Sequence, residues 1–160
     1  MAFGAILGQT ASGGGGKRVC RFTVGTSTAG WTANDCDYLC DGTADDVEIN
    51  AAIQALPAKG GEVVILDGTY NITATIAMNK DNTKLSGNGA STILKRMWNS
   101  NTTEGIITIN AANGGCCVEN LRIDGNKAAY SSNNIGIYLD NSNNNTITGN
   151  TCNNNNYGIY

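Results

Sequence analysis

The chain has 160 residues, of which only 14% are charged, and its formal net charge is −3. It contains 21 glycines and a single proline, a composition that suits a protein dense in turns and strands. There is no basic run, and no apolar run reaches the roughly 18 residues that span a bilayer, so we expect neither a nucleic-acid partner nor membrane insertion.

The first 16 residues form an apolar peptide followed by a glycine-rich linker. The peptide lacks a positively charged start and is short for the apolar part of a secretory signal. Two interpretations stay open. Either Phe3, Ile6 and Leu7 dock the chain onto a partner, or the segment is a disordered start.

A strand, a helix and a second strand are predicted next. Residues 17–24 have the pattern of a strand. Thr43 and Asp46 have the spacing of a capping box, where the helix would begin, and Pro57 would end it. Residues 62–66 form the second strand. The apolar face of the helix keeps helical spacing and consists of Ile49, Ala52, Ile53 and Leu56.

A short sequence pattern recurs in the second half of the chain. Three heptads fit Asn-x-x-[Leu/Ile]-x-Gly-Asn, at residues 82–88, 120–126 and 144–150. A Gly-Ile-x element recurs at residues 105–107, 136–138 and 158–160. The last two copies of this element lie 22 residues apart. Periods in this range are typical of solenoids, in which each repeat stacks on its neighbours.

We therefore predict an all-β fold, a parallel β-helix whose coils bury Leu85, Ile123 and Ile147 in one column. Ile137 and Ile159 would stack inside in the same way. The alternative is a disordered asparagine-rich tail.

Asparagine tolerates left-handed backbone conformations, so Asn88, Asn126 and Asn150 are expected at the corners of the coils. Stacked asparagine side chains can also hydrogen-bond to one another along the coils. A helix in front of such a stack would cover its open edge. The predicted organisation is a peptide and linker at 1–16, a strand, capping helix and first coil at 17–70, and further coils at 71–160.

The six cysteines do not have the spacing of a zinc site, and there is no histidine. Cys116 and Cys117 are adjacent, so on a strand they point to opposite faces and one of them should be buried. We expect free thiols, no metal and no cofactor.

The segment "DGTADDVEINAAIQAL…GGEVVILDGTYNI" resembles the N-terminal start of the pectate-lyase-like right-handed β-helix superfamily. The resemblance covers about residues 35–160 and implies a right-handed parallel β-helix with an N-terminal capping α-helix. The segments "MAFGAILGQT" and "VGTSTAGWTANDCDYLCDGT" also resemble the starts of tail-fibre and tailspike-like proteins of phages that infect Gram-positive bacteria.

The superfamily includes polysaccharide lyases, polysaccharide hydrolases and non-catalytic adhesins, so the fold does not choose among them. Arg122 and Asp124 flank Ile123 on one outward face. They form either the corner of a sugar site or a solvated surface. Aligning the heptads puts Ser86 and Thr148 at the position of Asp124 in neighbouring coils, and a second carboxylate is missing there. We therefore assign no catalytic residue, and catalysis by this chain is not the favoured expectation.

Tyr138 and Tyr160 occupy equivalent positions one coil apart and should stack on the outer face. Such a pair could be an aromatic track for a glycan or a ladder that stabilises neighbouring strands. Both interpretations stay open.

The resemblance favours a phage tail fibre or tailspike segment, a virion structural protein made in the host cytoplasm that contacts host cell-surface polysaccharide. Its expected partners are further copies of the chain, in a trimer, and a protein of the virion tail or baseplate. The alternatives are a polysaccharide lyase or hydrolase of the same fold and an extracellular bacterial surface adhesin.

Overall fold

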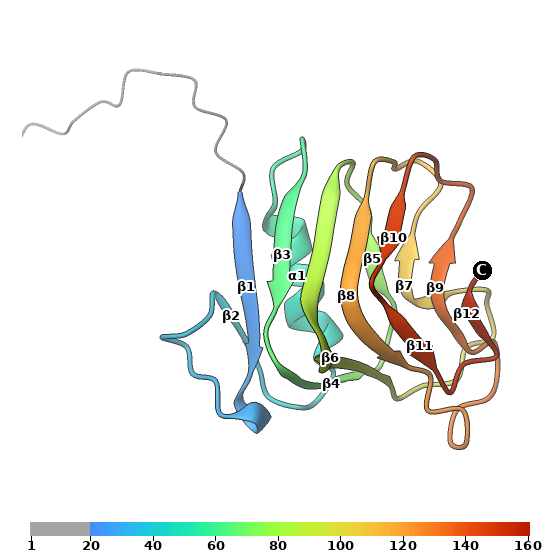
Figure 1. Cartoon of the computed structure of the whole chain (residues 1–160), viewed down its shortest axis with the longest axis horizontal. Coiled ribbons are helices and arrows are strands. Elements are labelled where there is room, and N and C mark those ends of the chain that lie inside the picture. The colour runs from blue at the N-terminus through green and yellow to red at the C-terminus, as the bar shows by residue number, and fades with distance from the viewer. Residues whose placement is uncertain (1–19) are drawn as a thin grey trace, which may run out of the picture.

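The computed structural model describes residues 20–160. The predicted docking residues Phe3, Ile6 and Leu7 lie outside this range. The described part holds twelve strands, one α-helix and a short 3-10 helix, and all of its strand pairs are parallel (Figure 1). The prediction of an all-β protein built from parallel strands is therefore confirmed.

The first elements are β1 (Arg21–Thr26), η1 (Ser27–Ala29), β2 (Tyr38–Cys40) and α1 (Asp46–Ala55). The chain then passes four times through the same two sheets, and we call each passage a repeat. Repeat 1 holds β3 (Gly61–Ile65), β4 (Gly68–Ile72) and β5 (Ile76–Met78). Repeat 2 holds β6 (Thr83–Arg96) and β7 (Gly105–Ile109). Repeat 3 holds β8 (Cys117–Asp124) and β9 (Ile135–Leu139). Repeat 4 holds β10 (Thr146–Thr148), β11 (Thr151–Asn153) and β12 (Tyr157–Ile159).

The strands form two sheets, which we call A and B. Sheet A has eight strands in the order β10-β8-β6-β3-β1-β2, with β4 paired to β6 and β11 paired to β8. Sheet B has the order β12-β9-β7-β5. Each repeat therefore adds one layer beside the preceding repeat. In Figure 1 the colours run from blue to red along the long axis for this reason.

Apolar side chains from successive repeats lie in register and form three columns. The first column is Val63, Leu85, Val118 and Ile147. The second is Tyr70, Leu94, Ile123 and Cys152. The third is Ile76, Ile107, Ile137 and Ile159. In repeats 1 to 3 every member is fully buried, so these columns are the core of the molecule.

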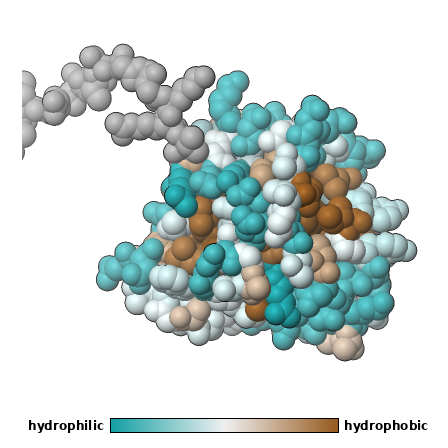
Figure 2. Space-filling model, in the orientation of Figure 1, coloured by the Kyte–Doolittle hydropathy of each residue, from teal (hydrophilic) through white to brown (hydrophobic). Residues whose placement is uncertain are grey.

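The columns are less buried in repeat 4, because within residues 20–160 its strands have a neighbour on one side only. Ile147 is half-buried, and Ile159 is 53% exposed. Ile147 packs against the core, so its predicted burial is confirmed in part, whereas the predicted burial of Ile159 is wrong. Figure 2 shows hydrophobic side chains at the surface on the right of the view, the side where the C-terminal strands lie in Figure 1.

The predicted single column of Leu85, Ile123 and Ile147 is also wrong. Leu85 pairs with Val118, whereas Ile123 pairs with Cys152 of the next repeat. β6 and β8 each have two halves, separated by irregular pairing. The heptad falls on the first half of β6 but on the second half of β8. The heptad ends in a Gly-Asn pair, which marks a bend in the chain. A bend can come after either half of these strands, so the motif alone does not show which halves pair with each other.

The Gly-Ile-x element predicts the register only in part. Ile137 and Ile159 pair as predicted. The copy at 105–107 is displaced by one residue, because Ile107 and not Ile106 pairs with Ile137.

Helix α1 confirms the predicted apolar face. Ile49, Ala52 and Ile53 are fully buried and Leu56 is 3% exposed. The predicted capping box of Thr43 and Asp46 is wrong, since no side chain caps the start of the helix. Asp46 Oδ1 instead accepts hydrogen bonds from the backbone nitrogen and the hydroxyl of Thr73, at 2.7 and 3.0 Å. The start of the helix is thereby tied to the chain that follows β4.

Left-handed residues lie at the ends and bends of strands. Asn126 has a φ of 47°, as its predicted corner position requires. Asn88 and Asn150 are not left-handed, and beside them Gly89 and Gly149 each take a φ of 63° instead.

Asparagine side chains link neighbouring repeats mainly by donating hydrogen bonds to backbone carbonyl oxygens. Asn150 Nδ2 donates to the carbonyl oxygen of Val118 at 2.8 Å, and Asn126 Nδ2 donates to that of Arg96 at 3.1 Å. Among residues 20–160 we find no hydrogen bond between two asparagine side chains, so the predicted asparagine ladder is wrong.

All six cysteines are free. Cys116 is buried, whereas Cys117 is half-buried and its Sγ lies 3.6 Å from Glu119 Oε2 on the outer side of sheet A. The predicted split of this pair between two faces is confirmed.

Candidate functional site

Three tyrosines gather around the last strands of sheet B. The rings of Tyr138 and Tyr160 have centroids 5.7 Å apart at an interplanar angle of 36°, and Tyr157 lies 5.3 Å from Tyr160. Tyr157 is 56% exposed and Tyr160 is 59% exposed. We call these three residues the tyrosine cluster. The sequence predicted the pair of Tyr138 and Tyr160, whereas Tyr157 was missed; it begins β12 and pairs in register with the buried Ile135.

The tyrosine cluster carries hydrogen-bonding groups beside its rings. The hydroxyl of Tyr138 donates to Asp140 Oδ1 at 3.5 Å. Desolvation and the nearby Asp140 carboxylate raise the pKa of Tyr138, so its phenol stays protonated at neutral pH. A sugar ring has an apolar face and a rim of hydroxyl groups. The tyrosine rings can stack on the apolar face, and the phenol and the Asp140 carboxylate can hydrogen-bond to the hydroxyls.

Arg122 and Asp124 lie on β8 in sheet A, so the structure does not place them in the tyrosine cluster. Their predicted neighbours were wrong, because the register puts Lys95 and Asn153 beside Asp124. Asp124 Oδ1 accepts hydrogen bonds from the backbone nitrogen of Asn126 and from Asn154 Nδ2, both at 2.9 Å. The Asp124 carboxylate therefore organises the turn that follows β8 and ties it to repeat 4.

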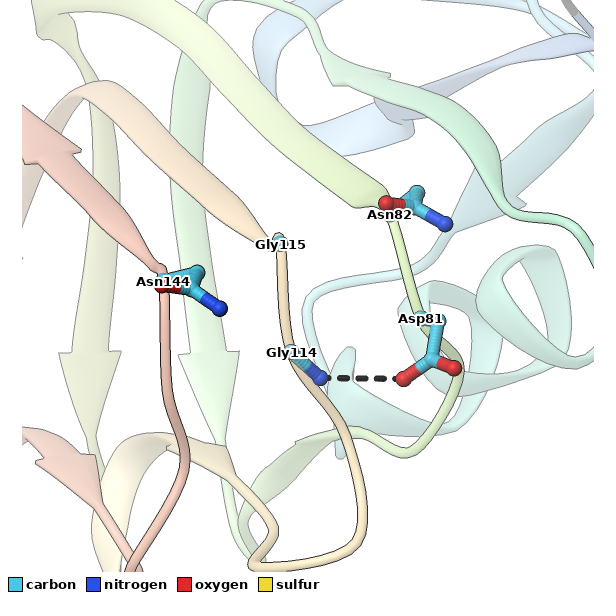
Figure 3. A pocket seen from close by; sticks show the side chains of 5 residues that line it. All are labelled: Asp81, Asn82, Gly114, Gly115 and Asn144. Carbon is cyan, nitrogen blue, oxygen red and sulfur yellow. Dashed lines mark hydrogen bonds between the residues drawn. The ribbon is translucent and has the colours of Figure 1, made fainter.

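A shallow pocket of about 300 Å³ opens next to this turn and is lined by Asn126, Lys127, Ala128 and Asn154. A second pocket, of about 350 Å³, lies where the chain turns into sheet A (Figure 3). Its lining includes the left-handed residues Asn82, Gly115 and Asn144, one from each of three successive repeats. Both pockets lie at corners of the repeat, and each is lined by asparagines, small residues and one charged residue, Lys127 in the first and Asp81 in the second.

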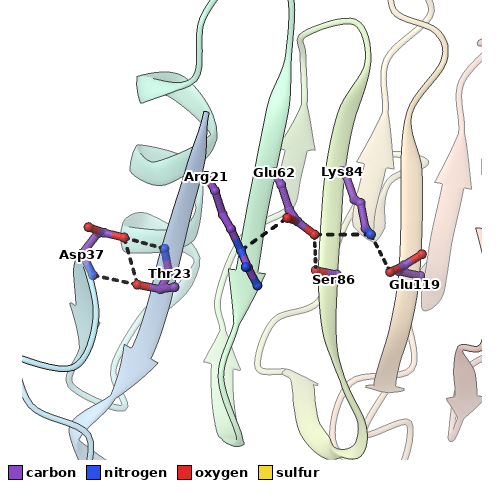
Figure 4. A network of polar contacts seen from close by, with 7 residues as sticks. All are labelled: Arg21, Thr23, Asp37, Glu62, Lys84, Ser86 and Glu119. Carbon is purple, nitrogen blue, oxygen red and sulfur yellow. Dashed lines mark hydrogen bonds and ion pairs between the residues drawn. The ribbon is translucent and has the colours of Figure 1, made fainter. Parts of the chain in front are cut away.

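A line of ion pairs crosses sheet A on its outer face (Figure 4). Arg21 pairs with Glu62 at 3.3 Å, and Lys84 lies 3.3 Å from Glu62 and 2.8 Å from Glu119. The hydrogen bond from Lys84 lowers the pKa of Glu119, and Glu119 in turn raises the pKa of Lys84. These charges neutralise one another, so we interpret the line as a tie between repeats. The sequence did not predict these ion pairs, because they depend on how the strands are aligned.

One group of side chains within residues 20–160 has the composition of a metal site. The ligand atoms of Cys40, Asp45 and Glu48 all lie within 4.8 Å of one another. Asp45 already accepts hydrogen bonds from the backbone nitrogens of Gly42 and Asn71, at 2.8 and 2.7 Å. Burial, together with the charges of Asp45 and Glu48, raises the pKa of the Cys40 thiol. The group holds the helix start in place.

Comparisons with known proteins support the fold. A solved structure, ORF18 of Geobacillus virus E2, superposes with a TM-score of 0.60 at 23% sequence identity. The match covers 81% of this chain and 25% of that one, so the chain spans about a quarter of the length of the viral protein. A comparison with curated proteins finds no match. Among residues 20–160, no helix has the length and apolar character needed to cross a membrane.

The model of the family described as periplasmic copper-binding protein (NosD) matches residues 25–160. Copper favours thiolate, thioether and imidazole ligands. The chain has no histidine, and Cys40, Asp45 and Glu48 offer a buried protonated thiol and two hard carboxylates, one of which is already engaged. These residues do not fit copper. The match nevertheless extends over nearly the whole described chain, and the protein belongs to the NosD family.

Proposed function

We propose that this chain is a segment of a phage tail fibre or tailspike-like protein that contacts bacterial surface glycans through the tyrosine cluster. The two sheets would be walls of a right-handed parallel β-helix, and α1 would cap its N-terminal end. The protein would act in the virion as a homotrimer attached to a tail or baseplate protein.

The strand register supports the proposed solenoid. Residues of four repeats follow one another in each column, and consecutive strands return to the same two sheets. Helix α1 lies against strands of both sheets, including β1 and β5. A helix in that position would shield the apolar start of the stack from water.

The observation that carries the glycan proposal is the tyrosine cluster. Aromatic rings that stack along successive repeats give a flat, partly apolar surface on which a chain of sugars can lie. Tyr138 and Tyr160 stack on each other across two successive repeats, and Tyr157 lies beside Tyr160. Aromatic faces stack on the apolar faces of sugar rings, and neutral phenols hydrogen-bond to their hydroxyls.

The viral source of ORF18, a protein with a similar fold, supports the assignment to a phage. Within residues 20–160, the register around Asp124 does not favour the enzymatic alternative. The residues in register beside Asp124 are Lys95 and Asn153, whereas glycoside hydrolysis needs a second carboxylate close by.

The proposal is tested by sedimenting the full chain with purified cell-wall polysaccharides and teichoic acids from a panel of Gram-positive bacteria. We expect retention by at least one polysaccharide and loss of retention after periodate oxidation of its sugars. The proposed contact with glycans is refuted if no polysaccharide retains the chain. Release of reducing ends from a bound polysaccharide would instead show an enzyme.

A further inference from the structure

The chain contains two Asn-Gly pairs, Asn88-Gly89 and Asn113-Gly114. In such a pair the backbone nitrogen of glycine can attack the side-chain amide of asparagine, because glycine has no Cβ to hinder the approach. We propose that Asn88 is a site of spontaneous deamidation and that the fold protects Asn113 from the same reaction.

The reaction consumes only water. The backbone nitrogen of Gly89 loses its proton and forms a bond to Cγ of Asn88. The bond from Cγ to the amide nitrogen breaks, and ammonia leaves with the proton that balances it. The five-membered succinimide that results is opened by water at either of its two carbonyls. The products are aspartate and isoaspartate at position 88, and no oxidant or reductant takes part.

The surroundings of Asn88 allow this ring to close. Asn88 is exposed, and the pairing of β6 with β8 is irregular on both sides of Gly89, between Ser86 and Ile93. Gly89 has a φ of 63°, and no atom lies within 4 Å of the position that a Cβ would take there. Asn88 itself is held by two hydrogen bonds, from its backbone nitrogen to Thr92 Oγ1 at 2.9 Å and from Nδ2 to Asp67 Oδ1 at 3.0 Å. Neither bond engages the attacking nitrogen of Gly89 or the electrophilic Cγ of Asn88, and the open side of Gly89 leaves space for the ring.

The surroundings of Asn113 oppose it. The backbone nitrogen of Gly114 donates a hydrogen bond of 2.9 Å to Asp81 Oδ1 (Figure 3). The carbonyl oxygen of Gly114 accepts a hydrogen bond from the backbone nitrogen of Asn82 at 3.0 Å. The carbonyl oxygen of Asn143 lies 2.7 Å from the Cβ position of Gly114. The attacking nitrogen is thus engaged by a carboxylate, and its residue is held on both sides.

Deamidation of Asn88 would alter a junction between repeats. Asn88 Nδ2 donates to Asp67 Oδ1 at 3.0 Å, and the carbonyl oxygen of Asp67 accepts a hydrogen bond of 2.7 Å from the indole of Trp31. A carboxylate at position 88 would lose the donated bond and put a second negative charge beside Asp67. The reaction would therefore loosen the tie between repeats 1 and 2 with time.

The test follows both pairs in the same sample of the full chain. The protein is incubated in mildly alkaline buffer, digested with trypsin and analysed by mass spectrometry. Asn88 is the only asparagine in the tryptic peptide of residues 85–95, and fragment spectra of the peptide of residues 97–122 locate Asn113. We expect Asn88 to be converted several-fold faster than Asn113 in the folded chain, and the two at similar rates in urea.

Two variants sharpen the result. Asn88→Gln should abolish the modification of the 85–95 peptide, because the longer side chain closes an unfavourable six-membered ring. Asp81→Ala should accelerate conversion of Asn113 and leave Asn88 unchanged. Equal rates at both sites in the folded wild type would overturn the proposal. So would an unmodified Asn88 after a time in which the urea-unfolded chain has reacted, whether or not the variants fold.

Discussion

Gly125 shows how closely neighbouring repeats approach each other at a corner. A Cβ at this position would lie 2.3 Å from the carbonyl oxygen of Asn154, 2.4 Å from Asn134 Oδ1 and 2.5 Å from Asn155 Oδ1. The two side-chain oxygens are buried and have no hydrogen-bond partner. The space that a Cβ would need at Gly125 is therefore already occupied, and only a hydrogen fits there.

Gly125→Ala should therefore destabilise the protein by about 3 kcal/mol, since three oxygen atoms must move apart and two of them are buried side-chain atoms. Gly30→Ala is the matched control. Its φ is 89°, but nothing lies within 4 Å of its Cβ position, so only backbone strain of about 1 kcal/mol is expected. Urea unfolding measures both. Equal losses at the two sites would show that crowding at Gly125 is unimportant.

The ion pair of Lys84 and Glu119 gives a prediction about pH. The pKa of Glu119 is lowered from 4.5, so its contribution to stability is present above pH 4.5 and is lost as the pH falls through its folded value. Both side chains are partly exposed, so the contribution is under about 1 kcal/mol. Lys84→Met should be less stable than wild type at neutral pH, and the difference should shrink below pH 4.5. A difference that is constant with pH in urea unfolding would contradict this account.

At the scale of the elements, the position of an isoleucine in the stack of repeats decides how much its side chain contributes to the stability of the fold. Ile123 is enclosed between Leu94 and Cys152, whereas Ile159 has a column neighbour on one side only within residues 20–160 and is 53% exposed. We expect Ile123→Ala to cost about 2–5 kcal/mol, as for a buried cavity. Ile159→Ala should cost less than about 1 kcal/mol, because little apolar area is removed from the core. Thermal unfolding compares the two, and a larger loss for Ile159→Ala would refute the register.

These same elements show what the sequence could predict. The 3.6-residue spacing of Ile49, Ala52 and Ile53 locates α1 because helical periodicity is local. The pairing of Leu85 with Val118 was missed because the repeats differ in length, and a local motif does not report on strand alignment. The ion pairs of Lys84 depend on that alignment and were missed for the same reason.

At the scale of the whole molecule, the proposed role in a phage tail fibre predicts assembly about one symmetry axis. We expect the chain, with a mass of 16.6 kDa, to form a homotrimer in solution. Static light scattering measures this directly. A stable monomer at high micromolar concentration would contradict the proposed fibre assembly. It would not affect the proposed glycan contact, which the binding experiments test separately.

The measurement that tests the central claim most directly is calorimetric titration of the retained polysaccharide into the wild type and into three variants. Tyr138→Ala and Tyr160→Ala should each weaken binding about two- to tenfold, equivalent to the roughly 0.5–1.5 kcal/mol of one aromatic stacking contact. Tyr38→Ala is the control, because Tyr38 packs against Phe22 at the other end of the molecule, with ring centroids 5.7 Å apart. It should bind like the wild type. Unchanged affinity of Tyr138→Ala and Tyr160→Ala would show that the tyrosine cluster is not the glycan site.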